Sequence, residues 1–402
     1  MIQFFKQKRV YLDYASAPPV RAEAEAAMRE AAHLVGNPGA IHREAVEAKK
    51  SLQHSRERIA RMLEVKARDV VFTSGLTESN NLAILGFARQ LERTRRSLEG
   101  THWVVSAIEH SSVLACFAEV ERLGGTVTHL DPDERGLITS AAVQSVLKAH
   151  TVFVSIGWAN NEIGTVQPLR DIAATLRAYE KAQGSEIIFH TDAGQAPLYL
   201  STTAHSLGVD LIALGSNKLY GPHGIGALYR SHRVHLAPVL FGGPQESGLR
   251  AGTENVALAA GFATACECAA RERESEAKRL RAMRDSLARA ILAEVPEVIV
   301  NGDMQHAMPH MLNISVPDIS SEYLALALDA RGFALSTKSA CREGEESLSH
   351  VVAALPVGRQ VSGGEAWAAA HTLRISLGRE TRPRDLAAFP GTLHRILRNQ
   401  RK

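Results

Sequence analysis

The chain has 402 residues, of which 45% are hydrophobic and 22% charged, and its 46 Lys and Arg nearly balance its 43 Asp and Glu. This composition excludes wholesale disorder, and the near-neutral charge argues against a nucleic-acid-binding protein. No apolar run approaches the length of a membrane span and no signal-peptide pattern is present, so we expect a cytoplasmic protein without a membrane segment.

Short apolar, β-branched runs recur through the first 230 residues. They predict strands at 70–73, 103–107, 127–130, 152–156, 187–191, 211–214 and 225–229. Helix-period segments lie between most of them, at 77–92, 140–149 and 169–183. Strands and helices that alternate in this way predict an α/β fold with a mostly parallel central sheet and helices on both faces.

The pattern changes after residue 253. Residues 254–294 predict a long helix that bridges two domains, apolar first and then charged, with room for a break where the composition turns. Segments 311–316, 334–336 and 373–376 predict strands of a smaller α+β domain. We therefore divide the chain into an N-terminal arm (1–15) packed on the small domain, a large domain (16–253), and a C-terminal part (254–402) with the bridging helix and the small domain.

Several common sites are not supported by the sequence. No Gly-Lys dipeptide occurs, which excludes a Walker A phosphate loop. Neither Cys-x-x-Cys nor His-Glu-x-x-His is present, so we expect no metal site. The four Cys are too few for a disulfide framework, and Cys266 and Cys268 fall on a predicted helix, where we expect them to be buried packing residues.

Polar loops follow the predicted strands. The loop Ser74-Gly75-Leu76-Thr77 opens a helix, where free amides and hydroxyls can form a phosphate cradle, although ordinary helix capping explains the same residues. A second loop, Asn160-Asn161-Glu162, follows strand 152–156.

Two charged residues lie at the ends of later predicted strands. Asp192 ends a buried strand, where a protonated pyridine nitrogen would be a suitable partner; capping of the next helix is the alternative. Lys218 follows another strand, where apolar surroundings would activate it as a Schiff-base nucleophile; a surface lysine is the alternative. A phosphate cradle, a carboxylate and a lysine in this order are the three groups that pyridoxal phosphate requires.

The same residues belong to a set of motifs that extends along the whole chain. The set comprises Tyr11-Leu12-Asp13-Tyr14-Ala15, Gly36-Asn37-Pro38, the loop from Thr73 to Asn81, Glu109-His110, Asn160-Asn161-Glu162, Asp192 with Gln195, Lys218-Leu219-Tyr220-Gly221-Pro222, Arg250-Ala251-Gly252-Thr253, Ser339-Ala340-Cys341 and Leu373-Arg374-Ile375-Ser376-Leu377-Gly378. In these motifs the sequence resembles the cysteine desulfurases of the NifS/IscS type. They belong to the class V aminotransferase family of pyridoxal-phosphate enzymes and have the fold type I architecture.

The resemblance implies a role for each matched residue. Lys218 would bind pyridoxal 5'-phosphate covalently, Asp192 would pair with its pyridine nitrogen, and His110 would stack on its ring and help to move protons. Other cofactor contacts would come from Asn161, Gln195, Leu76, Thr77, Ser216 and Asn217, and from Thr253 across the interface of a homodimer.

The resemblance also implies the reaction. Arg374, with Asn161, would bind the carboxylate of L-cysteine, and the Cys341 thiolate would take the substrate sulfur as a persulfide and leave L-alanine. A sulfur-acceptor protein, such as an iron–sulfur scaffold or a tRNA-thiolation protein, would receive it. Selenocysteine lyase or another class V aminotransferase activity, and a divergent cofactor-poor scaffold subunit, remain alternatives.

The sequence departs from the family pattern around the expected phosphate. Gly215 stands where relatives carry Ser, Asn217 where they carry His, Gly194 where they carry Thr or Ser, and Ala251 where they carry Ser. Each exchange removes or replaces a polar side chain, and the scaffold alternative rests on this loss.

Overall fold

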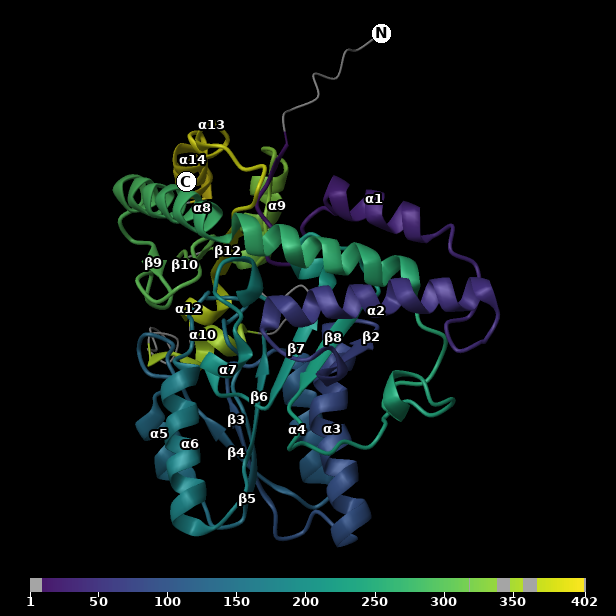
Figure 1. The fold of residues 1–402 in the computed structure, drawn as a ribbon. Coiled ribbons are helices and arrows are strands. Elements are labelled where there is room, and N and C mark those ends of the chain that lie inside the picture. The colour runs from purple at the N-terminus through teal and green to yellow at the C-terminus, as the bar shows by residue number, and fades with distance from the viewer. Residues whose placement is uncertain (1–8, 318, 338–347, 357–366, 401–402) are drawn as a thin grey trace.

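The computed structural model describes residues 9–317, 319–337, 348–356 and 367–400. A seven-stranded sheet forms the centre of the larger part (Figure 1). Its strands, in order across the sheet, are β2 (Val70–Thr73), β8 (Gly226–Arg230), β7 (Leu211–Gly215), β6 (Ile188–Asp192), β5 (Thr151–Ser155), β3 (His102–Ser106) and β4 (Thr126–Leu130). The strands from β7 to β4 pair in parallel, and only β8 runs antiparallel to its neighbours. The predicted α/β fold with a mostly parallel sheet is confirmed.

Helices occupy most of the remaining described chain. They are α1 (Ala22–Ala31), α2 (Arg43–Leu63), α3 (Leu76–Arg95), α4 (Ser111–Arg122), α5 (Ser140–Val146), α6 (Leu169–Gln183), α7 (Ala204–Leu207), α8 (Val256–Glu294), α9 (Ser321–Asp329), α10 (His350–Ala354), α12 (Trp367–Ala370), α13 (Pro383–Leu386) and α14 (Phe389–Gln400). Within the described ranges, no helix has both the length and the apolar composition needed to cross a bilayer.

Successive residues of the central strands enter two different apolar cores. Trp103 and Phe153 pack with α3 and α4, whereas their neighbours Val104 and Val154 join the core that includes α5, α6 and α8. Because adjacent side chains of a strand point to opposite faces, strands covered on both sides read as continuous apolar runs. This explains why the sequence located these strands to within about one residue.

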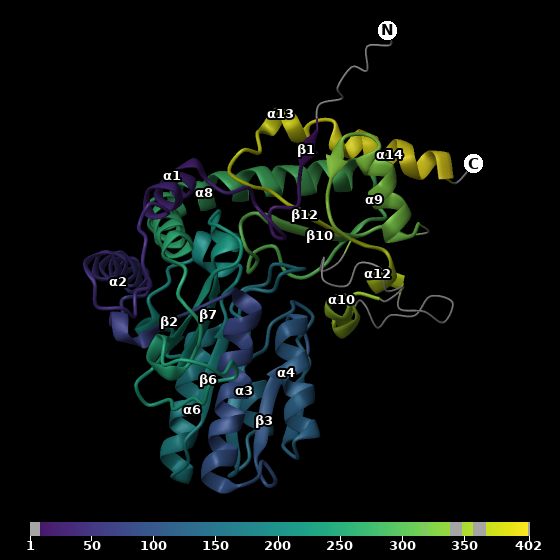
Figure 2. The ribbon, with the colours of Figure 1, turned by 90° about the vertical axis from the view of Figure 1, so that its right-hand side faces the viewer.

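A smaller group of elements packs around the C-terminal half of α8 (Figure 2). In its sheet β10 (Met311–Ser315) pairs antiparallel with β12 (Thr372–Ser376) and with β9 (Ile299–Val300). Near the N-terminus, β1 (Val10–Tyr11) pairs in parallel with β11 (Phe333–Ala334). These contacts connect the start of the described chain to the C-terminal elements; the domain boundaries themselves stay a prediction.

Helix α8 continues without a break through its charged half, from Arg271 to Arg284. The predicted long helix is therefore confirmed, and the break that its composition allowed does not occur. The guanidinium of Arg284 is only 1% exposed and donates to the carbonyl oxygens of Met304 and Met308, both at 2.9 Å. Charged residues that are matched by carbonyl acceptors on a neighbouring segment can continue a helix as well as apolar ones. Cys266 and Cys268 are buried on the same helix, as predicted.

Candidate active site

A cavity of about 230 Å³ brings most of the predicted site residues together. It lies where the parallel strands β3, β5 and β6 end, the edge at which α/β folds usually bind ligands. Its lining includes Leu76, His110, Asn161, Asp192, Gln195, Asn217, Lys218 and Arg374. Most of these residues lie at the strand ends of the central sheet, which the parallel strand order places at one edge, whereas Arg374 comes from β12 of the smaller sheet.

Lys218 lies on the short 3-10 helix Ser216–Leu219 that follows β7. Its Nζ donates to the main-chain oxygens of Ala15 (2.8 Å) and Ser16 (2.6 Å). The sequence had suggested apolar surroundings for this amine, and that expectation is wrong, because the N-terminal segment folds over the cavity and presents its carbonyls. Gln195 donates to the same Ala15 oxygen at 2.9 Å. The segment just before α1 therefore forms part of the cavity wall.

Asp192 is the last residue of β6 and is 9% exposed. Its Oδ1 accepts from the backbone N–H of Gly194 (2.8 Å), and its Oδ2 accepts from Asn80 Nδ2 (2.7 Å). His110 caps the N-terminus of α4, where its Nδ1 accepts from the backbone N–H of Ser112 (3.1 Å). Burial is the main cause that lowers the pKa of His110, so its neutral ring is favoured in this site.

Arg374 is central to β12 and almost fully buried, and its guanidinium bonds residues that lie outside β12. Its Nη2 donates to Asp13 Oδ1 (2.7 Å) and to Ser16 Oγ, and its Nη1 donates to the main-chain oxygen of Asn161 (2.9 Å). Its Nε, also buried, has no hydrogen-bond partner within the described residues. The side chain is thus held rigidly at the cavity and retains one buried donor.

The start of α3 supplies backbone donors to the same region. Gly75 precedes the helix with φ +155°, no side chain caps the helix in the described structure, and a Cβ on Gly75 would meet no atom within 4 Å. The first N–H groups of a helix have no partner within it, so this open end suits an anion. Together with Asp192 and Lys218 on one cavity, the residues present fit the phosphate, pyridine and aldehyde groups of pyridoxal phosphate.

Some predicted residues lie elsewhere. Thr77 is exposed in the first turn of α3, and Ser216 is buried with its Oγ close to Gly221 rather than on the cavity wall. Thr253 lines a different cavity, together with Phe72, and accepts from Asn37 Nδ2 at 3.5 Å. Cys341, with Lys338, Ser339 and Ala340, lies outside the described residues, so its role stays a prediction.

The structure adds functional candidates that the sequence did not identify as such. Glu109 lines the cavity and accepts from the backbone N–H of Gly157 (2.7 Å), and burial raises its pKa to about 8. Asn80 and Asp13 contact Asp192 and Arg374 directly. Asp13, Asn80 and Glu109 all belong to, or adjoin, motifs of the sequence, but only the fold shows which residues they contact.

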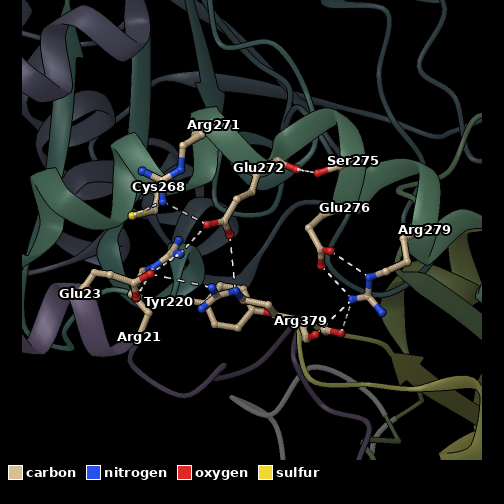
Figure 3. A network of polar contacts seen from close by, with 11 residues as sticks. Arg21, Glu23, Tyr220, Cys268, Arg271, Glu272, Ser275, Glu276, Arg279 and Arg379 are labelled. Carbon is tan, nitrogen blue, oxygen red and sulfur yellow. Dashed lines mark hydrogen bonds and ion pairs between the residues drawn. The ribbon is translucent and has the colours of Figure 1, made fainter.

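A network behind Lys218 connects the two groups of elements (Figure 3). Tyr220 OH accepts from the backbone N–H of Arg379 (2.9 Å), three residues beyond β12. Arg279 of α8 donates to the main-chain oxygens of Gly378 (3.1 Å) and Thr381 (2.8 Å), and its guanidinium pairs with Glu276. Helix α8 therefore fixes the segment that follows Arg374 against the segment that follows Lys218.

The chain is similar along its whole length to known proteins. The class V aminotransferase family matches residues 10–389. The cysteine desulfurase IscS of Dictyoglomus turgidum is 36% identical over 396 residues, which cover 98% of this chain and 96% of that protein. Cysteine desulfurase IscS 1 of Archaeoglobus fulgidus is 34% identical and covers 96% of this chain and 97% of its own length.

Solved structures share the fold. A NifS-like protein superposes with a TM-score of 0.87 at 28% identity, over 97% of this chain and all of that one. A structure described as SspA in complex with cysteine gives a TM-score of 0.76 at 32% identity, over 91% and 98% of the two chains. Together with the cavity geometry, these similarities establish the family: the chain belongs to the class V aminotransferases, as a pyridoxal-phosphate-dependent cysteine desulfurase of the IscS and NifS type.

Proposed function

We propose that this protein takes sulfur from L-cysteine, releases L-alanine, and holds the sulfur as a persulfide on Cys341. The observation that carries the proposal is the convergence of Lys218, Asp192, His110 and Arg374 on one cavity. Their chemistry is what removal of sulfur from an amino acid requires: an amine, a charge partner for the cofactor ring, a proton carrier and a carboxylate clamp.

Each side chain at the cavity has a distinct task in this proposal. Pyridoxal phosphate, when bound, supplies a conjugated ring that accepts the electrons released at the substrate α-carbon. Lys218 would attach it and move a proton at that carbon, Asp192 would pair with the ring nitrogen, and Gln195 and Asn161 would contact the ring substituents. The N-terminus of α3, with Leu76 and Asn217 on the cavity wall, would hold the phosphate. Thr77 and Ser216, which the resemblance also assigns to the phosphate, lie off that wall.

Arg374 is the proposed site for the substrate carboxylate. Its Nη groups are held by Asp13, Ser16 and the Asn161 carbonyl, which fixes the plane of the guanidinium before substrate arrives. The remaining buried Nε–H is a donor for an incoming carboxylate oxygen.

The thiol of Cys341 is the proposed acceptor of the sulfur that leaves the substrate. Cysteine and an enzyme thiol give alanine and an enzyme persulfide: the substrate C–S bond breaks, an S–S bond forms, and the α-amino acid takes up a proton at its β-carbon. The described residues on either side of the 338–347 segment support this role. Ser336 pairs with Arg374 through two backbone hydrogen bonds, and Ser349 Oγ donates to the buried Glu162 at 2.6 Å. Both flanks adjoin cavity-lining residues.

The remaining parts of the proposal concern the protein's context. We infer a cytoplasmic homodimer in which Thr253 reaches the partner's phosphate site. The persulfide then passes to an acceptor protein, of the kind that builds iron–sulfur clusters or thiolates tRNA.

The test is a product assay with defined variants. The purified protein with pyridoxal phosphate and L-cysteine should release alanine and, with a reductant, an equal amount of sulfide. Cys341→Ser should lose both products and Lys218→Ala should lose the visible absorbance as well, whereas Cys268→Ser, which alters a buried thiol of α8, should retain turnover. Undiminished alanine release by Cys341→Ser would indicate a lyase or transaminase, and no visible absorbance in the wild type would indicate a scaffold subunit.

A further inference from the structure

Asn80 is a fully buried amide on α3 that the proposed reaction does not use. Its Nδ2 donates to Asp192 Oδ2 (2.7 Å) and to Ser112 Oγ (2.9 Å), which occupies both of its N–H groups. The reverse orientation of the amide would place Oδ1 against a carboxylate oxygen, so the donors must face Asp192. Asn80 Oδ1 has no partner within the described structure, a cost that the bond to the Asp192 carboxylate and the bond to the Ser112 hydroxyl offset.

Ser112 extends this contact to His110. Because its Oγ accepts from Asn80, its own hydroxyl proton is available to His110 Nδ1, which lies 2.8 Å away. The backbone N–H of Ser112 donates to the same nitrogen at 3.1 Å. Two donors at Nδ1 mean that this nitrogen is an acceptor, so the proton of the neutral ring is on Nε2.

We propose that Asn80 is a positioning residue that orients the Asp192 carboxylate and, through Ser112, keeps the His110 imidazole neutral with its proton on Nε2. The inference rests on the proposed roles of Asp192 and His110 at the cofactor. One amide then sets the geometry of two groups: Asp192, which it contacts directly 112 residues further along the chain, and His110, which it reaches by way of Ser112, 32 residues further along. The hydrogen bonds that Ser112 donates to Nδ1 oppose protonation of that nitrogen.

The charged groups around His110 act in opposite directions on its protonation, so a fixed hydrogen-bond donor is needed to hold the ring neutral. Asp192 and Glu162 favour the imidazolium, whereas Lys218, His350 and, above all, burial oppose it. His350 of α10 contacts the same region, since its Nε2 lies 2.9 Å from the Glu109 main-chain oxygen. A carboxylate and an imidazole in one buried site tend to share a proton, and a fixed donor between them prevents that.

The experiment measures His110 directly by NMR of protein labelled with ¹⁵N-histidine, with the His110 signals assigned from their loss in His110→Gln. The ring nitrogens report both the tautomer and the pKa, with and without added pyridoxal phosphate. The wild type should show the Nε2–H tautomer. Asn80→Ala and Ser112→Ala should each raise the pKa of His110 by about one unit. Ser112→Ala removes the hydroxyl that donates to Nδ1, and Asn80→Ala removes the amide that orients this hydroxyl. Asn81→Ala is the control, because among the described residues this neighbouring side chain bonds only the Thr77 carbonyl, and it should leave the titration unchanged.

A second measurement separates the contact of Asn80 with Asp192 from its contact with Ser112. Asn80→Ala should weaken pyridoxal phosphate binding about tenfold, because Asp192 loses an orienting donor, whereas Ser112→Ala should bind it as the wild type does. A His110 titration unchanged in Asn80→Ala, or an Nδ1–H tautomer in the wild type, would overturn the inference. If Asn80→Ala does not fold, an unchanged titration in Ser112→Ala would overturn it equally. Because histidine titration needs no turnover, failure of the proposed function would be seen separately, as absent alanine release.

Discussion

At the residue scale, Leu76 explains two of the departures from the family pattern. A Cβ built on Gly194 would lie 2.5 Å from Leu76 Cδ2, and one on Gly215 would lie 3.1 Å from Leu76 Cβ. The leucine side chain therefore occupies the space that hydroxyl side chains at 194 and 215 would need. The two glycines and Leu76 are a matched set, and the lost polar groups reflect a differently packed wall rather than decay of the site.

This matching predicts strong coupling between the positions. Gly194→Ser should destabilise the protein by about 1–3 kcal/mol, because the added atoms overlap Leu76. Leu76→Ala should largely remove that penalty in the double variant, which gives a coupling energy of about 1 kcal/mol or more in a urea-unfolding cycle. Additive single effects would show that the wall adapts to the serine without help from position 76.

At the scale of elements, what could be predicted depended on how far each contact reaches along the chain. The strands and the strand-end positions of Asp192 and Lys218 followed from local runs and turns. The surroundings of these residues did not, because the carbonyls of Ala15 and Ser16 approach Lys218 from about 200 residues away. The sequence predicted α8 as one long helix but left a break open where its composition turns, because its charged residues are matched by distant main-chain oxygens, which no local pattern encodes.

Arg279 is the residue of α8 on which this long-range matching can be tested. Arg279→Ala removes donors to Gly378 and Thr381, so it should lower the free energy of unfolding by about 1–3 kcal/mol. Because that segment also meets Tyr220, the variant should raise the KM for cysteine more than it lowers kcat. Arg281→Ala, at an exposed position on the same helix, is the matched control and should change neither quantity. Equal effects of the two substitutions would mean that α8 acts only through its apolar face.

At the scale of the whole molecule, the segment that carries Thr253 lies away from the Lys218 cavity. It meets the loop between α1 and α2 through the Asn37–Thr253 contact, and both segments lie on the same side of the sheet (Figure 1). Large apolar side chains are exposed on them: Ile41 is 96% and Phe241 62% accessible. Apolar side chains gathered beside a residue that is expected to act across an interface indicate where a second copy would bind.

We therefore expect a dimer at micromolar concentration whose stability depends on Phe241. Phe241→Asp places a charge in the proposed interface, so it should weaken dimerisation at least about tenfold in sedimentation equilibrium and, because Thr253 would no longer reach the second site, weaken pyridoxal phosphate binding as well. Leu326→Asp is the control: Leu326 is 70% exposed on α9, among the C-terminal elements, and its replacement should leave both properties unchanged. A fully active wild-type monomer, or equal weakening by the two substitutions, would exclude this face as the interface and would place the complete cofactor site within one chain.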